Sequence, residues 1–267
     1  MPSHTKVVDI CEKRAACEHC IVSRKCLDQD HGGAAACLFR DNAGQVQLLH
    51  RGDYLFRAGD SMNGLYIIRS GIFKTYFVSE DGEEQILGFH LPGDIIGFDG
   101  IAGGEFASNA MALDTASVCR LPFETFNGTG PGTAQFQQAL LKGMSREILR
   151  QENMLMLLGK KKADERLASF LYSHSVYQTR RGYSATVLTL AMTRTDIGKY
   201  LGLTVETISR VLSRLQVQGI IEVRANRIHI LDLDALQALS GDAGERPRAR
   251  AHTPRPHQAR RAPAPSG

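Results

Sequence analysis

The chain has 267 residues and a formal net charge of +4, with 43% hydrophobic and 22% charged residues. This length allows one large or two ordinary domains, each with a buried core, and no apolar run approaches the roughly 18 residues that a transmembrane helix needs. The residues before Cys11 contain no apolar stretch typical of a secretory signal, so we expect a cytoplasmic protein.

The small net charge conceals four segments of opposite sign. Residues 1–159 carry a net charge of −5, residues 160–230 carry +7, residues 231–245 carry −4 and residues 246–267 carry +6. An acidic body joined to a basic module indicates that only one part of the chain meets a polyanion. Chance clustering of charges is the alternative at this point.

Five of the six cysteines lie close together near the N-terminus: Cys11, Cys17, Cys20, Cys26 and Cys37. In a reducing compartment such a group is a metal site or a redox switch rather than a disulfide framework. We therefore expect a cofactor to organise residues 1–38. Three of the cysteines form a C-x2-C-x5-C run, which suits an iron–sulfur cluster, a zinc ion completed by His19 or His31, or redox-active thiols. The residues alone leave these alternatives open.

Residues 39–132 have the pattern of a small β-domain. Segments rich in β-branched and aromatic residues, at 65–68, 71–78 and 85–91, are separated by turns that contain Gly and Asp. Short strands at this spacing predict a barrel or roll. Cys119 lies in the apolar segment 118–121, where it is either a further metal ligand or a small buried hydrophobic residue.

Residues 133–159 change to a helical period. Apolar residues recur at spacings of 4, 7 and 3, and the missing position of this seam is a glutamine. The seam consists of Met144, Ile148, Gln151, Leu155 and Leu158. The pattern predicts a coiled-coil dimerisation helix; the alternative is a long helix that packs on its own β-domain.

Residues 160–240 are predicted to form a winged helix-turn-helix. A helix over 164–177 is followed by a short helix that Thr193 caps, with Asp196 three residues on, and that ends in a turn at Gly202. Thr204 caps the next helix, from Val205 to about Val217. Two short strands then flank residues 224–226 as a hairpin. Residues 241–267 are rich in Pro and Arg and are expected to be a disordered basic tail.

The helix that begins at Val205 is the candidate DNA-recognition helix. Ile208, Leu212 and Leu215 form its buried side, and the opposite stripe consists of Glu206, Ser209, Arg210 and Ser213. Arg bonds guanine and Glu accepts from cytosine, so this stripe suits base edges. Lys199, Arg214, Arg224 and Arg227 are candidate phosphate contacts. An ordinary polar helix face is the alternative, which the adjacent Gly turn and the +7 module disfavour.

Residues 201–210, Leu-Gly-Leu-Thr-Val-Glu-Thr-Ile-Ser-Arg, resemble the recognition motif of FNR-type (fumarate and nitrate reduction) regulators in the CRP/FNR superfamily. The resemblance covers about residues 15–240, through the further segments 69–71, 88–94, 97–99, 121–124 and 161–168. It implies an α+β fold: a cysteine-rich loop and a cupin-like, cyclic-nucleotide-binding-type β-roll, then a dimerisation helix and a winged helix-turn-helix. It also implies a transcription regulator rather than an enzyme, whose homodimer binds palindromic TTGAT-type operators and meets RNA polymerase.

The resemblance further implies a [4Fe-4S] cluster that is sensitive to oxygen. Its ligands correspond to Cys17, Cys20, Cys26 and Cys119, whereas Cys11 and Cys37 are departures from the family pattern. A regulator of the same family with a thiol or zinc switch is the alternative. A ligand-binding roll or iron–sulfur carrier without DNA function is the alternative of another class, and the recognition stripe argues against it.

Two further departures from known family patterns concern how the activity of the protein is regulated. Cyclic-nucleotide receptors hold the phosphate with an Arg-Ser pair, whereas residues 104–109 have Phe106 and Ala107 in the comparable stretch. We therefore expect no cyclic nucleotide. FNR-like proteins generally have an acidic residue where this chain has Gln151, although Glu147 and Glu152 lie nearby. The loss of that charge predicts a tighter dimer and some residual activity in air.

Overall fold

The computed structural model describes residues 46–122, 133–180 and 183–241. The N-terminal part is a β-roll of two four-stranded sheets, whose strand pairs are all antiparallel. The first sheet has the order β1-β8-β3-β6 and the second has the order β2-β7-β4-β5. The elements are β1 (Val46–Leu49), β2 (Tyr54–Phe56), β3 (Gly64–Ser70), β4 (Phe73–Val78), β5 (Glu84–His90), β6 (Ile95–Ile96), the 3-10 helix η1 (Phe98–Gly100), β7 (Asn109–Ala112) and β8 (Ala116–Pro122).

The predicted strands at 65–68, 71–78 and 85–91 correspond to β3, β4 and β5, so that part of the prediction is confirmed. Their aromatic and β-branched side chains fill the space between the sheets; Ile68, Phe73 and Val118 are completely buried there. Gly71, with φ +78°, closes the turn between β3 and β4, where a Cβ atom would lie 2.5 Å from that of Ala116. The roll is thus closed by backbone that only glycine adopts easily.

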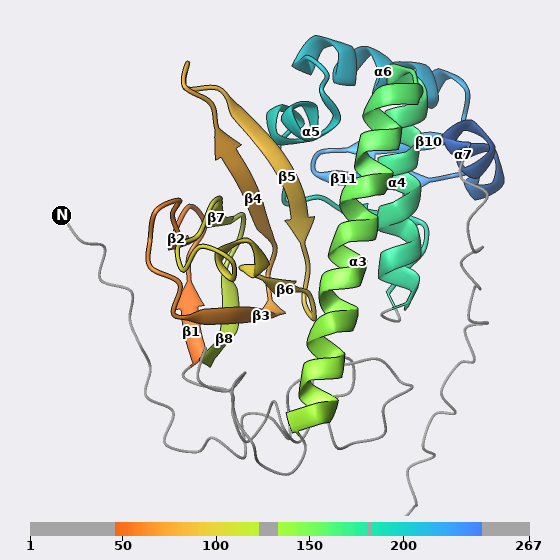
Figure 1. Cartoon of the computed structure of the whole chain (residues 1–267). Helices are drawn as coiled ribbons and strands as arrows, with labels where there is room; N and C mark the ends of the chain where they lie inside the picture. Colours follow the sequence, from red (N-terminus) through yellow and green to blue (C-terminus); the bar gives the residue numbers. More distant parts are fainter. Residues whose placement is uncertain (1–45, 123–132, 181–182, 242–267) are drawn as a thin grey trace, which may run out of the picture.

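The long helix α3 (Thr133–Lys160) runs beside the roll and beside α4 of the C-terminal module (Figure 1). One face of α3 packs on the roll: Leu140 joins a cluster with Leu65, Ile67 and Leu121. Gly143 lies against Phe98, whose ring would be 3.3 Å from an added Cβ atom. The helix therefore packs on its own roll, as the alternative interpretation expects, and leaves another face exposed; the coiled-coil dimer stays a prediction.

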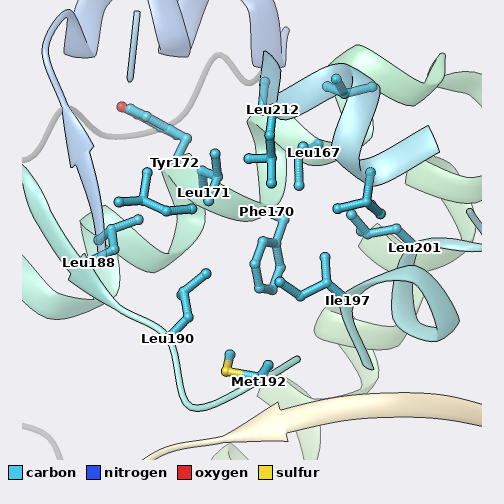
Figure 2. Packing of buried hydrophobic residues seen from close by; sticks show 14 of the residues in the cluster. Leu167, Phe170, Leu171, Tyr172, Leu188, Leu190, Met192, Ile197, Leu201 and Leu212 are labelled. Carbon is cyan, nitrogen blue, oxygen red and sulfur yellow. The ribbon is translucent and has the colours of Figure 1, made fainter. Parts of the chain in front are cut away.

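The C-terminal module is a winged helix-turn-helix. It comprises α4 (Ala163–Arg180), β9 (Val187–Thr189), α5 (Arg194–Leu201), α6 (Val205–Val217), β10 (Ile221–Arg224), β11 (Arg227–Ile230) and α7 (Leu233–Ser240). The three strands pair in the order β10-β11-β9. Figure 2 shows its core, in which Phe170 and Leu171 of α4, Ile197 of α5 and Leu212 of α6 converge. The strand β9 and the helix α7 were not predicted as separate elements.

The core of this module continues into the roll. Tyr76, Ile86 and Phe89 of the roll belong to the same buried cluster as the winged-helix residues. The ring of Phe89 lies 5.1 Å from that of Tyr200 and 6.1 Å from that of Phe170, measured between centroids. The helix α5 therefore rests on β5, as Figure 1 shows.

The predicted α+β fold class is confirmed by this architecture. The exact boundaries at 38, 132, 159 and 240 stay predictions. The cysteine-rich segment 1–38 lies outside the described residues, as does the predicted tail after Gly241. Within the described part of the chain, no helix is long and apolar enough to cross a membrane.

Candidate nucleic-acid interface

The turn between α5 and α6 depends on two glycines. Gly202 ends α5 with φ +62°, a left-handed conformation that glycine adopts at least cost. Gly198, inside α5, lies so close to the turn that a Cβ atom would be 2.5 Å from the carbonyl oxygen of Leu203. The sequence pattern identified Gly202, whereas the close approach at Gly198 became visible only in the structure.

Both helices of the motif begin at the predicted caps. The Thr193 hydroxyl accepts from the backbone N–H of Asp196, and the Asp196 carboxylate accepts from that of Thr193, which completes a capping box. The hydroxyl of Thr204 accepts from the backbone N–H of Thr207 at 3.2 Å. These predictions from the sequence are confirmed.

The helix α6 has one buried and one exposed face, as predicted. Ile208, Val211, Leu212 and Leu215 are buried, and Val211 adds to the predicted set. On the opposite face Glu206, Arg210 and Ser213 are exposed and Ser209 is half-buried. The four side chains proposed to contact bases therefore lie together on one open stripe of the helix.

Local hydrogen bonds shape the chemistry of this stripe. Bonds to its own backbone N–H and to the Thr204 hydroxyl lower the pKa of Glu206, so its carboxylate is ionised at neutral pH. Arg210 donates to the hydroxyl of Thr207 at 3.3 Å, and the Ser213 hydroxyl donates to the backbone oxygen of Ser209 at 3.0 Å. The stripe thus combines an anion, a cation and hydroxyls, which together suit the donors and acceptors of a major groove.

Arg194 is a residue of this surface that the sequence analysis missed. It is the first residue of α5, and its guanidinium donates to the Ser209 hydroxyl at 3.1 Å. Helical spacing within α6 could not reveal it, because Arg194 comes from the other helix of the motif. The only local signal was a basic residue directly after the Thr193 cap.

The four candidate phosphate contacts have different surroundings. Lys199 is half-buried and donates to Glu84 of the roll at 2.9 Å, so it faces β5 in this structure. Arg214 is exposed and pairs with Asp164. Arg224 pairs with Glu222 at 2.9 Å across the exposed wing. Arg227 is exposed opposite Arg224 in the hairpin register. The last three are open to solvent, and all four remain predictions as DNA contacts.

Of the predicted metal ligands, the structure describes only Cys119. Its side chain is buried in β8, where its register partners are Ile67 of β3 and Val46 of β1. Val46 is the first described residue, so residues 1–45, which contain Cys17, Cys20 and Cys26, directly precede the strand that pairs with Cys119. Within residues 46–122, 133–180 and 183–241, no group of three His, Cys, Asp or Glu side chains is arranged to hold a metal.

The interior of the roll is filled by aromatic side chains. Phe106 is buried and stacks on Phe56, with ring centroids 3.9 Å apart, and Tyr66 lies beside both rings. The neighbouring Ser108 donates from its hydroxyl to Asp99 at 2.7 Å. Phe106 is therefore part of the apolar core. From the sequence, this position corresponds to the Arg-Ser pair of cyclic-nucleotide receptors, which this chain lacks.

The exposed face of α3 is centred slightly away from the predicted seam. Ile148 and Leu155 are exposed, as expected, whereas Met144, Gln151 and Leu158 are half-buried at one edge. The exposed apolar side chains of α3 are Leu141, Ile148, Leu149, Leu155 and Met156. Glu152 is also exposed, between Ile148 and Leu155, and Gln151 donates to Glu147 at 2.8 Å.

Comparison with known proteins assigns this architecture to a family. A family model described as a cyclic nucleotide-binding domain matches residues 46–129, and one described as a Crp-like helix-turn-helix domain matches residues 165–239. The chain is 43% identical over 225 residues to the fumarate and nitrate reduction regulatory protein of Salmonella typhi, which is 84% of this chain and 90% of the relative. The chain belongs to the CRP/FNR family of transcription regulators.

Two further members of the CRP/FNR family support this assignment. The anaerobic regulatory protein of Haemophilus influenzae is 43% identical over 84% of this chain and 88% of its own length. The solved structure of FixK2 from Bradyrhizobium japonicum is 31% identical, with a TM-score of 0.67 over 74% of this chain and 98% of that chain. The protein is therefore a DNA-binding regulator and not an enzyme, and α6 is the recognition helix of its helix-turn-helix.

Proposed function

We propose that this regulator responds to oxygen. At low oxygen its homodimer binds inverted-repeat operators of the TTGAT type and controls the switch to anaerobic or microaerobic metabolism, in contact with RNA polymerase. The observation that supports the proposal is the pairing of Cys119 with Val46, because residues 1–45, which contain the cysteine cluster, join the roll at Val46. The open stripe on α6 supplies the contacts to base edges.

The donor set fits a [4Fe-4S] cluster held by Cys17, Cys20, Cys26 and Cys119. Four thiolates are the usual ligands of such a cluster, and a buried thiol beside the entry of the N-terminal segment supplies the distant one. When bound, the cluster supplies a reaction with oxygen that changes its own structure. The chain's part is to tie residues 1–45 to β8, next to the sheet that packs on α3.

The exposed face of α3 supports a homodimer. Its five exposed apolar side chains are left uncovered by the described residues, and burial of apolar surface is the main driving force for association. Glu152, at the centre of this face, opposes the approach of a second copy because two like charges would meet. Gln151 at the edge removes one further charge, which supports our prediction of a tighter dimer with residual activity in air.

We propose that no cyclic nucleotide controls this protein. Phe106 occupies the interior of the roll, and no arginine in the stretch 104–109 offers a partner for a phosphate diester. The alternative effector is a zinc ion or a reversible thiol oxidation at the same cysteines, within the same family of regulators.

Anaerobic purification tests the proposal. The protein should have the brown absorption of an iron–sulfur cluster, with equal iron and sulfide, and should bind an inverted-repeat operator; air should remove both the colour and most of the binding. Cys119→Ser should lose the cluster, whereas the matched control Cys37→Ser should keep it. A colourless zinc protein with the same DNA affinity in nitrogen and in air would refute the cluster.

The dimer has its own measurement. Analytical ultracentrifugation of the aerobic protein at micromolar concentration should detect a dimer, and Ile148→Glu should abolish it because a charge would enter the apolar face. Lys160→Gln, at the end of the same helix, changes the net charge by the same one unit outside the apolar face and serves as the control. Detection of monomer alone in the wild type would contradict the prediction made from Gln151.

A further inference from the structure

Four charged side chains alternate in sign where the helix-turn-helix rests on the roll. Lys74 of β4 lies 3.0 Å from Asp196 of α5 and 3.5 Å from Glu84 of β5, measured from Nζ to the carboxylate oxygens. Lys199 of α5 donates to the same Glu84 at 2.9 Å. The amide of Gln85 donates to the backbone oxygen of Lys199 at 2.8 Å. Two strands of the roll therefore bind α5 through polar contacts as well as through Phe89.

Because Lys74 is buried, this cluster of charges favours one position of α5 on the roll. Its side chain is only 8% exposed, and a buried ammonium is unfavourable unless carboxylates surround it. Burial raises the pKa of Asp196, but hydrogen bonds from Thr193 and Lys74 outweigh it and leave the pKa below its usual value. A shift of α5 along β5 would separate these charges, whereas apolar contacts alone tolerate sliding.

The same hairpin of strands also holds α3. The Thr75 hydroxyl and the imidazole of His90 share a hydrogen bond of 2.8 Å, and Arg150 of α3 lies 3.3 Å from the other nitrogen of that ring. Arg150 also lies 3.8 Å from Asp94. Because β4 and β5 carry contacts to both α3 and α5, they define the angle between the dimerisation helix and the recognition module.

This docked arrangement covers neither functional surface. Glu206, Arg210 and Ser213 remain exposed on α6, and Ile148 and Leu155 remain exposed on α3. The contact between α5 and the roll is therefore compatible with a dimer bound to DNA. Its consequence is orientation, because it holds each recognition helix at one angle to the helix that joins the two copies.

We propose that Lys74 and Glu84 are positioning residues that set the half-site spacing which the dimer accepts in its operator. They act through α5 and do not touch DNA. An operator lengthened by one base pair at its centre moves one half-site by about 3.4 Å and rotates it by about 36°. A dimer whose modules are held at a fixed angle cannot follow that change. The inference rests on the proposed binding of a dimer to an inverted repeat.

The test compares Glu84→Gln with the matched control Glu83→Gln, in which an exposed neighbouring residue loses the same charge. Two operators are used, one with the native spacing and one with a single base pair added at the centre. The wild type and the control should prefer the native operator by about tenfold or more, and Glu84→Gln should reduce this preference to about threefold or less, because the modules adapt to both. The dimer constant should not change.

A second measurement follows docking without DNA. Amide hydrogen exchange in 196–201 of α5 should accelerate in Glu84→Gln and in Lys74→Met, while exchange in α6 stays as in the wild type. Lys74→Met replaces the buried ammonium with an unbranched apolar side chain that is one atom shorter. The melting temperature and the dimer constant of this variant show whether it is folded.

The outcomes are distinct. The proposal would be overturned if a variant exchanged faster in α5 but kept the wild-type spacing preference. It would also be overturned if hydrogen exchange in α5 accelerated in neither variant. Tighter binding of Glu84→Gln to both operators would also overturn it, because the contact would then restrain the module instead of orienting it. If the wild type bound no inverted repeat, the proposed function would fail and this proposal with it. The exchange experiment would still report whether Glu84 holds α5.

Discussion

The two helices of the helix-turn-helix use the same kinds of residues for opposite purposes. Both α5 and α6 begin at a threonine cap and carry acidic and basic side chains. On α5 two of these charges face the roll, since Asp196 is 9% exposed and Lys199 is bound to Glu84, whereas Arg194 at the start of the helix contacts α6. On α6 Glu206 and Arg210 face solvent. The sequence of a helix therefore does not say whether its charges bind DNA or bind the rest of the protein.

The difference has an energetic side. Charge pairs at the surface contribute little to stability, so Glu206 and Arg210 lose little when they exchange water for bases and phosphates. Lys74 and Asp196 are already desolvated, and removal of one partner leaves a buried charge. Changes on α6 should therefore affect DNA binding, whereas changes beneath α5 should affect stability and orientation. The following predictions test that division.

The largest effect on DNA binding is expected for Arg210→Ala on α6. Loss of a bidentate arginine costs about 1–3 kcal/mol, so affinity for the cognate operator should fall by about 5- to 150-fold, with relaxed base preference at one position. Arg224→Ala on the wing is the control; it should weaken binding to all sequences evenly and reduce the salt dependence. Fluorescence anisotropy at several salt concentrations measures both. Full affinity in Arg210→Ala would contradict the role of the stripe.

Gly198→Ala should affect both helices at once. Its Cβ atom would lie 2.5 Å from the carbonyl oxygen of Leu203, so the turn must open, at a cost of about 1–3 kcal/mol. Gly159→Ala adds the same atom to α3 where nothing lies within 4 Å, and should be neutral or slightly stabilising. Thermal unfolding followed by circular dichroism compares the two. Equal melting temperatures would mean that the turn relaxes freely.

Local chemistry explains what could be predicted in this module. Thr193, Thr204 and Gly202 act on neighbours within a few residues, and the apolar period of α6 identifies its buried side without knowledge of the fold. These features were confirmed. The same holds for the alternating strands of the roll, whose turns are marked by Gly and Asp.

The remainder depends on residues far apart in the chain. Lys199 contacts Glu84, which lies 115 positions away, and Asp196 contacts Lys74 across 122 positions, so local patterns could not predict either pair. Leu158 is half-buried beside Gly202 in the turn between α5 and α6, a contact that no heptad pattern states. A one-dimensional pattern identifies which residues are charged or apolar, but not which surface will cover them.

Acid should lower the stability of the buried part of the protein before it changes the charges on the exposed face of α6. Burial lowers the pKa of His90 and of His174 to about 4, from an ordinary value of 6.5. Between these values the unfolded chain binds more protons than the folded one. Stability is therefore complete above about pH 6.5 and falls by about 1.4 kcal/mol per pH unit for each histidine as the pH drops towards 4. The pKa of Glu206 is lowered, so its carboxylate keeps its charge to a lower pH than an ordinary glutamate does.

Urea unfolding at pH 7, 6 and 5 measures this slope. His174→Leu should remove about half of it, because His174 is buried beside Phe170 and its Nε2 has no hydrogen-bond partner among the described residues. His50→Gln, whose side chain is exposed, should leave the slope unchanged. A slope that survives in His174→Leu would assign the acid sensitivity to other groups.

The smallest effect is expected at the tip of the wing, the hairpin of β10 and β11, which follows α5 and α6 in the chain. Ala225 has φ +53°, in the two-residue loop between Arg224 and Arg227. Glycine, asparagine and aspartate are favoured at such a position, because a Cβ atom is strained there by about 1–2 kcal/mol. Ala225→Gly should therefore raise the free energy of unfolding by about 0.5–1 kcal/mol, since the greater freedom of glycine in the unfolded chain offsets part of the relief. Ala102→Gly, at an exposed residue without positive φ, should lower it instead. The wing is proposed to present Arg224 and Arg227 to phosphates. If it does nothing else, the operator affinity of Ala225→Gly should stay within about twofold of the wild type. A clear loss of affinity in the more stable Ala225→Gly variant would show that the strained turn itself orients the wing on DNA.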